Sequence, residues 1–167
     1  ESKWTEERKQ RAKTEIEHIL LSSGKLIEKE IVPDQVDLSE VILVSGHCPK
    51  GGVDIWAEEM ADNLGIQKEI YPAEVNQWED KEIPYDCHDY GHLKGYKSRN
   101  IQIAEACDIL YCIVPASTHK AYAGGLPYQE SDYCYHCLQF GHIKSGGCWT
   151  LRYANEKLGK ETHLVVI

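Results

Sequence analysis

Two glycine-rich turns, each standing directly before an amphipathic helical pattern, constrain the fold of this chain most strongly. The first runs from Gly46 to Gly52 and follows the apolar run Val41–Ser45, and the second runs from Ser145 to Thr150. The first N–H groups of a helix have no partner within the helix, and the helix dipole favours negative charge at that end. Phosphate groups bind readily at such places. The two turns therefore predict a domain that holds a phosphorylated small molecule, most simply a nucleotide or a nucleotide derivative.

Apolar periodicity along the chain alternates between helical and strand-like segments. After the first turn, apolar residues repeat with a helical period from Val53 to Leu64, and Gly65 is a suitable helix end. Further helices are expected at 4–23, 95–107 and 149–158, and strands at 41–45, 67–71, 109–114 and 163–167. Short apolar strands that alternate with helices are typical of a parallel sheet covered on both faces. The expected fold class is therefore α/β, a Rossmann-like doubly wound parallel sheet in a single domain over residues 1–167.

Three stretches do not fit this alternation. Residues 25–40 contain Pro33 and predict an irregular connection, while 73–94 and 115–144 are rich in Tyr, Cys and His. The two longer stretches follow strands, at the edge of the sheet where doubly wound folds bind their ligands. We expect them to be irregular functional loops, inserted into the scaffold as Cys/His-rich segments.

The formal net charge of −9, from 27 acidic and 18 basic residues, limits the partners. Proteins that bind a nucleic-acid polymer usually carry a basic surface, so no such polymer is expected. No apolar run approaches the roughly 20 residues that span a bilayer, so no membrane partner is expected either. Seven cysteines beside eight histidines, without a secretory signal pattern, favour reduced thiols and a cytoplasmic protein.

The candidate ligand-binding residues come from the two turns and from the start of one helix. Glycines let the backbone approach a ligand closely, and an arginine can hold a phosphate through two hydrogen bonds. The full set is Gly46, Lys50, Gly51, Gly52, Asp54, Arg99, Asn100, Ser145, Gly146, Gly147 and Thr150. A structural alternative stays open, in which the first turn is an ordinary tight connection and Asp54 caps the helix.

A second constellation points to zinc. Cys134 and Cys137 have the Cys-x2-Cys spacing that is typical of zinc sites. Cys87 and His92, from the other long loop, complete a tetrahedral set, so the predicted ligands are Cys87, His92, Cys134 and Cys137. Other histidines compete with His92 for the fourth position, namely His88, His136 and His142, the last at the spacing of a zinc knuckle. A closed site with four protein ligands is structural, whereas an open one activates water; the closed form is expected.

Five segments taken together, 44–61, 71–74, 98–100, 106–110 and 145–150, resemble the SLOG superfamily, and most of all its YspA-type branch. The wider superfamily includes lysine-decarboxylase-like phosphoribohydrolases, molybdenum-cofactor carrier proteins and nucleotide-sensing domains. The resemblance covers residues 41–167 and implies a Rossmann-like fold with a nucleotide-derived ligand, in which Arg99 matches the functional arginine of the hydrolases. It also implies a first strand upstream of Glu1 and a homodimer.

Three functional hypotheses follow. In the first, the protein binds a nucleotide-like small molecule while zinc orders the rim of the site. In the second, it is an N-glycosidase that acts on nucleoside phosphates and needs a carboxylate near the anomeric carbon, with Asp54, Glu58 and Glu156 as candidates. The phosphoribohydrolases carry a catalytic Glu soon after their glycine turn, but here Leu151 and Arg152 follow that turn, so the sequence leaves catalysis open. In the third, the metal site is open and supports zinc-dependent hydrolysis.

Overall fold

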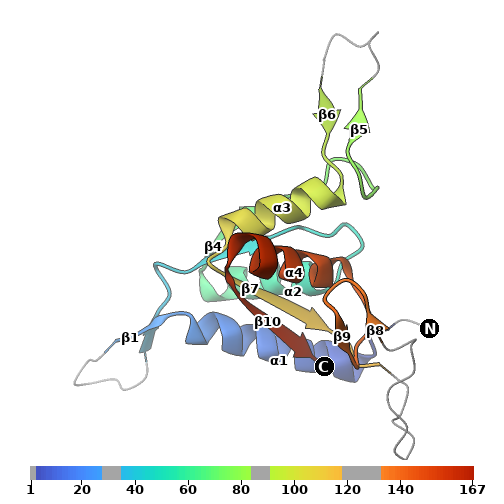
Figure 1. Ribbon diagram of the computed structural model, residues 1–167. Coiled ribbons are helices and arrows are strands. Elements are labelled where there is room, and N and C mark those ends of the chain that lie inside the picture. Colours follow the sequence, from blue (N-terminus) through green and yellow to red (C-terminus); the bar gives the residue numbers. More distant parts are fainter. Residues whose placement is uncertain (1–2, 28–34, 84–90, 118–132) are drawn as a thin grey trace, which may run out of the picture. The chain divides into compact units, whose positions relative to one another are not determined.

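The computed structural model describes residues 3–27, 35–83, 91–117 and 133–167 (Figure 1). The chain forms two compact units. Unit 1 consists of Glu1–Lys9 and Asn100–Ile167, and unit 2 consists of Gln10–Arg99. Each unit is described by itself below, and the expectation of a single domain stays a prediction.

Unit 2 is built around one strand–helix–strand segment. Strand β3 (Ile42–Ser45) pairs in parallel with β4 (Gln67–Ile70), with Ile42 opposite Gln67 and Ser45 opposite Ile70. Helix α2 (Val53–Leu64) connects the two strands and packs against both. Gly65 ends the helix in the left-handed conformation, with φ of 70°, and its N–H bonds back to carbonyls of the last turn. The helix and its glycine stop confirm the predictions for this segment.

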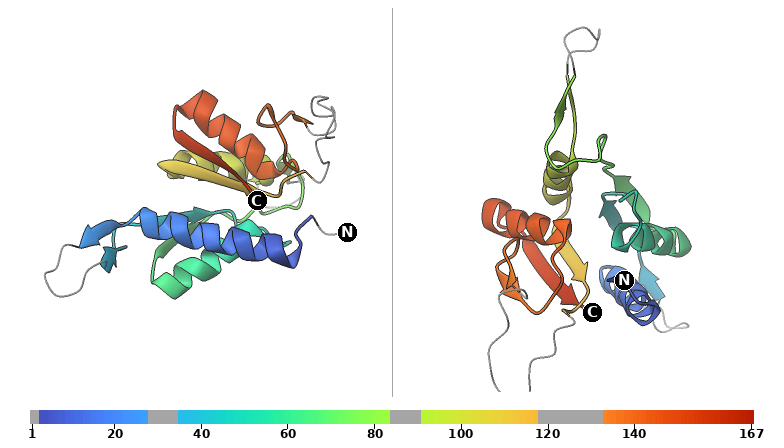
Figure 2. Two further views of the ribbon diagram at one scale, coloured as in Figure 1. Left: turned by 90° about the horizontal axis from the view of Figure 1, so that it is seen from below. Right: turned by 90° about the vertical axis from the view of Figure 1, so that its right-hand side faces the viewer.

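Unit 1 repeats this arrangement with longer strands. Strand β7 (Ile109–Val114) pairs in parallel with β10 (Glu161–Val166) over six residue pairs, and helix α4 (Gly146–Leu158) packs against both (Figure 2). The interior of this unit contains Leu110, Cys112, Val114, Leu151 and Ala154, all buried. The helix begins at Gly146, and the prediction of a start at Trp149 was wrong because glycines are poor helix formers by propensity alone.

Two further helices bury three residues each, and the rest of their residues are partly or fully exposed. Helix α1 (Glu6–Ser22) buries only Ala12, Ile16 and Leu20, which lie four residues apart and so share one face. Helix α3 (Tyr96–Ala106) begins beside Asp80.

The stretches expected to be irregular contain short antiparallel strand pairs. The pairs are β1 (Lys25–Ile27) with β2 (Gln35–Asp37), β5 (Lys81–Glu82) with β6 (His92–Leu93), and β8 (Tyr133–Cys134) with β9 (Gln139–Phe140). The prediction of irregular loops was wrong at these positions. Strands of two or three residues are too short to show an alternating apolar pattern, so sequence periodicity does not reveal them.

The fold class is therefore confirmed as α/β, with short parallel strand pairs packed against helices and a Cys/His cluster beside them. One doubly wound sheet that includes all of these strands stays a prediction. Among the helices in the described ranges, none combines the length and the apolar composition needed to cross a bilayer.

Candidate metal centre and candidate anion site

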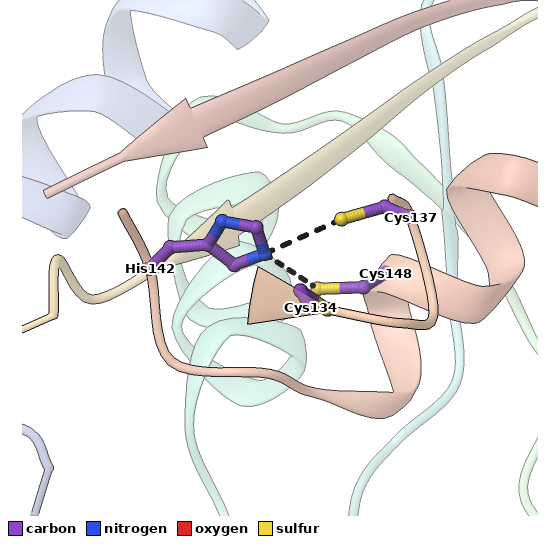
Figure 3. Close-up of side chains that lie close together, drawn as sticks. All are labelled: Cys134, Cys137, His142 and Cys148. Carbon is purple, nitrogen blue, oxygen red and sulfur yellow. Dashed lines mark hydrogen bonds between the residues drawn. The ribbon is translucent and has the colours of Figure 1, made fainter. Parts of the chain in front are cut away.

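Three thiols and one imidazole converge within unit 1 (Figure 3). They belong to Cys134, Cys137, His142 and Cys148, and their ligand atoms all lie within 4.8 Å of one another. All four side chains are buried, with Cys148 fully enclosed and Cys137 at 8% exposure. Buried polar groups need partners, and a set of three sulfurs and one imidazole nitrogen is a common zinc-binding set. The cluster can therefore hold a metal ion such as zinc.

The β8–β9 hairpin places the first two cysteines. Cys134 ends β8, and its carbonyl accepts a hydrogen bond of 2.7 Å from the N–H of Leu138, which closes the turn that carries Cys137. Leu138 has a positive φ of 61°, a conformation that side chains with a Cβ seldom adopt. Because the turn is tight, two cysteines separated by only two residues can both direct their sulfurs into the cluster.

The backbone around His142 is held by the segment that follows β7. His142 forms a bridge with Ala116, and the N–H of Ile143 donates to the Pro115 carbonyl at 2.9 Å. On the other side, the N–H of Ser117 donates to the Gly141 carbonyl at 2.9 Å. These main-chain hydrogen bonds fix the backbone position of His142 without the help of a metal.

The ring of His142 has the orientation of a metal ligand. Its Nε2 lies 3.3 Å from Sγ of Cys137 and 3.5 Å from Sγ of Cys148 (Figure 3). Its Nδ1 lies 3.4 Å from the carbonyl oxygen of Phe140. Histidines that bind metals through one nitrogen commonly donate the other N–H to a carbonyl, which fixes the tautomer. Nε2 is therefore the atom available to a metal.

The size of the cluster matches a single ion. With zinc–sulfur bonds of about 2.3 Å and zinc–nitrogen bonds of about 2.0 Å, a tetrahedral site separates its ligand atoms by about 3.5–3.8 Å. The distances of 3.3 and 3.5 Å from Nε2 of His142 to two sulfurs, and the limit of 4.8 Å for the whole set, lie close to that geometry. Only small movements are needed to surround one zinc ion.

The thiols of the cluster differ in acidity. A hydrogen bond from the Cys112 thiol, assisted by Ser145 and His142, lowers the pKa of Cys148 to about 4, whereas burial raises the pKa of Cys137 to about 12. The same contact with Cys148 raises the pKa of Cys112 well above its ordinary value. Cys148 therefore loses its proton more readily than Cys137, and binding of a cation by Cys137 requires loss of the Cys137 proton.

The predicted zinc ligands are distributed over several places. Cys134 and Cys137 lie in the cluster, while Cys87 and the competing His88 lie outside the described residues. His92 lies exposed in β6 of unit 2, so the predicted set of four stays untested as a set. His136 is half-buried, and the centre of its ring lies 4.4 Å from that of Tyr135, with the two ring planes tilted by 32°.

Cys148 is the member of the Cys/His cluster that the spacing of Cys and His in the sequence did not single out. Cys148 lies within the second glycine turn, which the sequence assigned to ligand binding and not to metal binding. The sequence does contain a signal for Cys148. It follows the zinc-knuckle spacing of the first three residues and supplies a fourth ligand, in the pattern Cys134-x2-Cys137-x4-His142-x5-Cys148.

The first glycine turn, in unit 2, combines an uncapped helix start with a buried cation. The N-cap residue of α2 is Gly52, with φ of 103° and no side-chain cap, and a Cβ added at Gly51 or Gly52 would meet nothing within 4 Å. Arg99 is 7% exposed and donates from Nη1 to Oδ2 of Asp54, in the first turn of α2, at 3.2 Å. Its Nε is buried and makes no hydrogen bond with the described residues. Lys50 is exposed beside this turn, and Gly46 is buried at its start.

A buried carboxylate lies at the same turn. Glu58 of α2 accepts a hydrogen bond of 2.6 Å from Oγ of Ser45 at Oε1, and its Oε2 lies 2.7 Å from Nδ1 of His47. Glu58 and Ser45 are buried, whereas the side chain of His47 is 53% exposed. His47 has a positive φ of 46°. Only Glu58 was named from the sequence, as one of three candidate carboxylates; its two partners had no recognisable spacing.

The second glycine turn, in unit 1, packs against the Cys/His cluster. A Cβ on Gly147 would lie 3.0 Å from Sγ of Cys112, which gives this glycine a steric role. Thr150 donates its hydroxyl to the Gly146 carbonyl at 3.2 Å, and Oγ of Ser145 lies 3.5 Å from Sγ of Cys148. Asn100 is buried. The ligand-binding roles of these residues stay predictions.

Comparisons of the chain with protein-family models, with curated proteins and with solved structures found no match. The resemblance to the SLOG superfamily therefore stays a prediction, and the site is argued from its own geometry.

Proposed function

We propose that this protein binds one zinc ion through Cys134, Cys137, His142 and Cys148, and that the ion has a structural role. The observation that carries the proposal is the convergence of four buried donor atoms within 4.8 Å. Four protein ligands fill the tetrahedral preference of zinc and leave no position for a water molecule. The geometry thus favours a closed site over the hydrolytic alternative with an open metal position.

The metal would join segments that otherwise have few apolar contacts. Two ligands come from the β8–β9 hairpin, one from the strand-like segment beside Ala116, and one from the first turn of α4. Around them, Tyr133, Leu138 and Phe140 are exposed, so little of the hairpin is held by hydrophobic burial. Zinc binding supplies folding free energy in such small elements.

Metal analysis of protein purified without added metal tests this proposal. We expect about one equivalent of zinc in the parent protein, and little in the Cys148→Ser variant. Cys107→Ser is the matched control, because Cys107 is also buried but bonds to the Ala104 carbonyl and lies outside the cluster. A metal-free parent protein that is fully folded would refute the proposal.

A second candidate function is binding of a phosphorylated, nucleotide-like small molecule at the first glycine turn. The supporting observation is Arg99, a buried guanidinium with an unused Nε that reaches the uncapped first turn of α2. Such a turn attracts an anion through its free N–H groups, and arginine adds a fixed positive charge. The adjacent Asp54 suits a ribose hydroxyl, as acidic residues do in dinucleotide-binding folds.

Thermal-shift measurements with nucleoside 5′-monophosphates and with inorganic phosphate test this second function. We expect nucleotides to raise the melting temperature of the parent protein and of Arg152→Ala, but not of Arg99→Ala. Arg152 is a suitable control because its guanidinium is exposed and pairs with Glu156 on the surface of α4. Equal stabilisation of the Arg99 variant would exclude this binding site.

A further inference from the structure

A fifth sulfur lies beside the Cys/His cluster. Cys112, in the middle of β7, donates a hydrogen bond from its thiol to Cys148 and forms another with the hydroxyl of Ser145. Cys112 is not one of the four converging donors, and four ligands already complete a tetrahedral zinc site. The chain therefore holds a thiol that is in contact with a sulfur of the proposed site and that the metal does not use.

Packing of α4 on β7 keeps these two sulfurs together. Cys148 lies in the first turn of α4, and Cys112 is 4% exposed on the strand against which this helix packs. A Cβ on Gly147 would lie 3.0 Å from Sγ of Cys112, so the lack of a side chain at this position lets the turn approach the strand. The contact between the two thiols is thus built into the fold of unit 1.

The cover over this pair of thiols is thin. Cys148 is fully enclosed, but Gly146 and Gly147, the two residues before it, are exposed and carry no side chain that could shield the sulfurs. They belong to the first turn of α4, whose N–H groups lack partners within the helix, so this turn opens at a lower free-energy cost than the helix interior. A small neutral oxidant such as hydrogen peroxide can enter there.

Cys148 and Cys112 have the two roles that reversible thiol oxidation requires. A metal-bound thiol is deprotonated, the thiolate is the form that reacts with oxidants, and the resulting sulfenic acid condenses with a neighbouring thiol. We propose that hydrogen peroxide oxidises Cys148, and that Cys112 then closes a disulfide with it and so releases the zinc ion. The proposal rests on the structural zinc site above, because that site assigns Cys148 as a ligand.

The reaction balances with hydrogen peroxide as the oxidant. Sγ of Cys148 attacks one peroxide oxygen, an S–O bond forms as the O–O bond breaks, and hydroxide leaves. Sγ of Cys112 then attacks Sγ of Cys148, the S–S bond forms as the S–O bond breaks, and the oxygen departs as water with the proton of the Cys112 thiol. Each sulfur has lost one electron, the peroxide has gained two, and the hydroxide takes a proton from solvent.

Disulfide formation changes the metal site and the segment that it stabilises. Cys148 can no longer bind the ion, which leaves Cys134, Cys137 and His142 as donors. Three ligands hold zinc more weakly than four, and the β8–β9 hairpin, with Phe140 exposed, has little hydrophobic burial to replace the metal. Reduction of the disulfide restores the fourth ligand, so zinc binding follows the redox state of the surroundings.

Oxidation of the zinc-loaded protein tests the inference. Zinc content is measured first, peroxide is added in small excess, and metal release is followed with a chromogenic zinc indicator. Free thiols are then alkylated, and the disulfides are identified by digestion and mass spectrometry. We expect the parent to begin with about one equivalent of zinc, to lose it, and to contain a Cys112–Cys148 disulfide. Reduction in the presence of zinc should restore the bound metal.

Cys112→Ser separates the proposed role from a role in packing. Serine has nearly the same size and still donates a hydrogen bond to Cys148, so before oxidation this variant should bind zinc as the parent does. Without the second thiol, Cys148 should be oxidised further to sulfinic acid, which reductants do not reverse, and most of the zinc binding should be lost permanently. The control is Cys107→Ser, which should recover zinc like the parent, because Cys107 is buried but bonds to the Ala104 carbonyl.

Several outcomes would contradict the inference. Zinc that stays bound in the presence of peroxide, a first disulfide between Cys134 and Cys137 in the parent, or full recovery of zinc by oxidised Cys112→Ser would each overturn it and leave the structural zinc site intact. If Cys112→Ser does not fold, the disulfide map of the parent decides. A folded parent protein without zinc would overturn both the inference and the proposed function.

Discussion

Sγ of Cys148 lies 3.5 Å from Nε2 of His142, which brings the first turn of α4 into direct contact with the loop that precedes it. The helix start is therefore part of the cluster, and the glycines before Cys148 have a structural task beside any role in ligand binding. Gly147 packs on Cys112, and Ser145 contacts Cys148. The stability of unit 1 should thus depend on the metal and on the shape of this turn.

Removal of the metal should destabilise the protein. A ligand that binds only the folded state contributes about 4 kcal/mol when its free concentration is 1,000 times its Kd. We therefore expect a chelator such as EDTA to lower the melting temperature of the parent by several degrees, and added zinc to restore it. The comparison with Cys148→Ser is decisive, because that variant should show a low melting temperature with or without chelator. If the chelator lowers both melting temperatures equally, the effect does not come from this cluster.

Acid should release the metal. Thiolates and the neutral imidazole are the forms that bind zinc, so protons compete with the ion, and affinity falls as the pH falls. Titration in the presence of a chromogenic zinc indicator should show release on acidification and recovery on return to neutral pH. Cys107→Ser should release zinc over the same pH range as the parent. Retention of the metal in strong acid would contradict the assignment.

Gly147→Ala should destabilise unit 1 by about 1 kcal/mol. The new Cβ would lie 3.0 Å from Sγ of Cys112, which is 4% exposed in the middle of β7 and has little room to move. Overpacking of this kind typically costs about 1–3 kcal/mol, and the helix propensity of alanine offsets up to about 1 kcal/mol of it.

Gly146→Ala is the control for this substitution. Its Cβ would lie 3.8 Å from Nδ2 of Asn100, an ordinary contact, so a neutral or slightly stabilising effect is expected. Urea unfolding of both variants gives the comparison. Equal free energies of unfolding for the two variants would show that Cys112 can move away from the new Cβ without loss of stability.

Asp80 should contribute to stability in a pH-dependent way. Hydrogen bonds from the Ser98 hydroxyl and from the Gly95 N–H lower the pKa of Asp80 below its ordinary value of 3.8. A carboxylate whose pKa is lower in the folded state stabilises that state above its ordinary pKa, and the contribution disappears as the pH falls through the lowered value.

The measurement compares the parent with Asp80→Asn across this range. The parent should be the more stable protein at pH 6, and the difference should shrink below about pH 4, where the carboxylate becomes protonated in the unfolded chain. A difference that stays constant over the whole pH range would mean that Asp80 acts only through packing.

Much of the fold could be predicted from local patterns. The helix from Val53 to Leu64 and its stop at Gly65 follow from apolar spacing and from the need for a positive φ at the helix end. Strand β7 was readable as a continuous apolar run. The β8–β9 hairpin was not readable, because it is held by backbone turns and by convergence of polar side chains, and not by a repeating apolar face.

In the candidate sites too, residues close together in the sequence could be predicted, whereas contacts between distant segments could not. Cys134 and Cys137 are close in sequence, so their spacing alone marks them. Cys148 and His142 become neighbours only when α4 forms, and the Ser45–Glu58–His47 contacts require α2 to pack on β3. Contacts of this kind depend on tertiary packing, which no short sequence window contains.

The approach of Gly147 to Cys112 also has an evolutionary consequence. The sulfur of Cys112 takes up the space that a side chain at position 147 would need, so position 147 holds a glycine. In descendants of a common ancestor, positions 112 and 147 should therefore change together, with a bulkier residue at 147 arising only where the residue at 112 has become smaller.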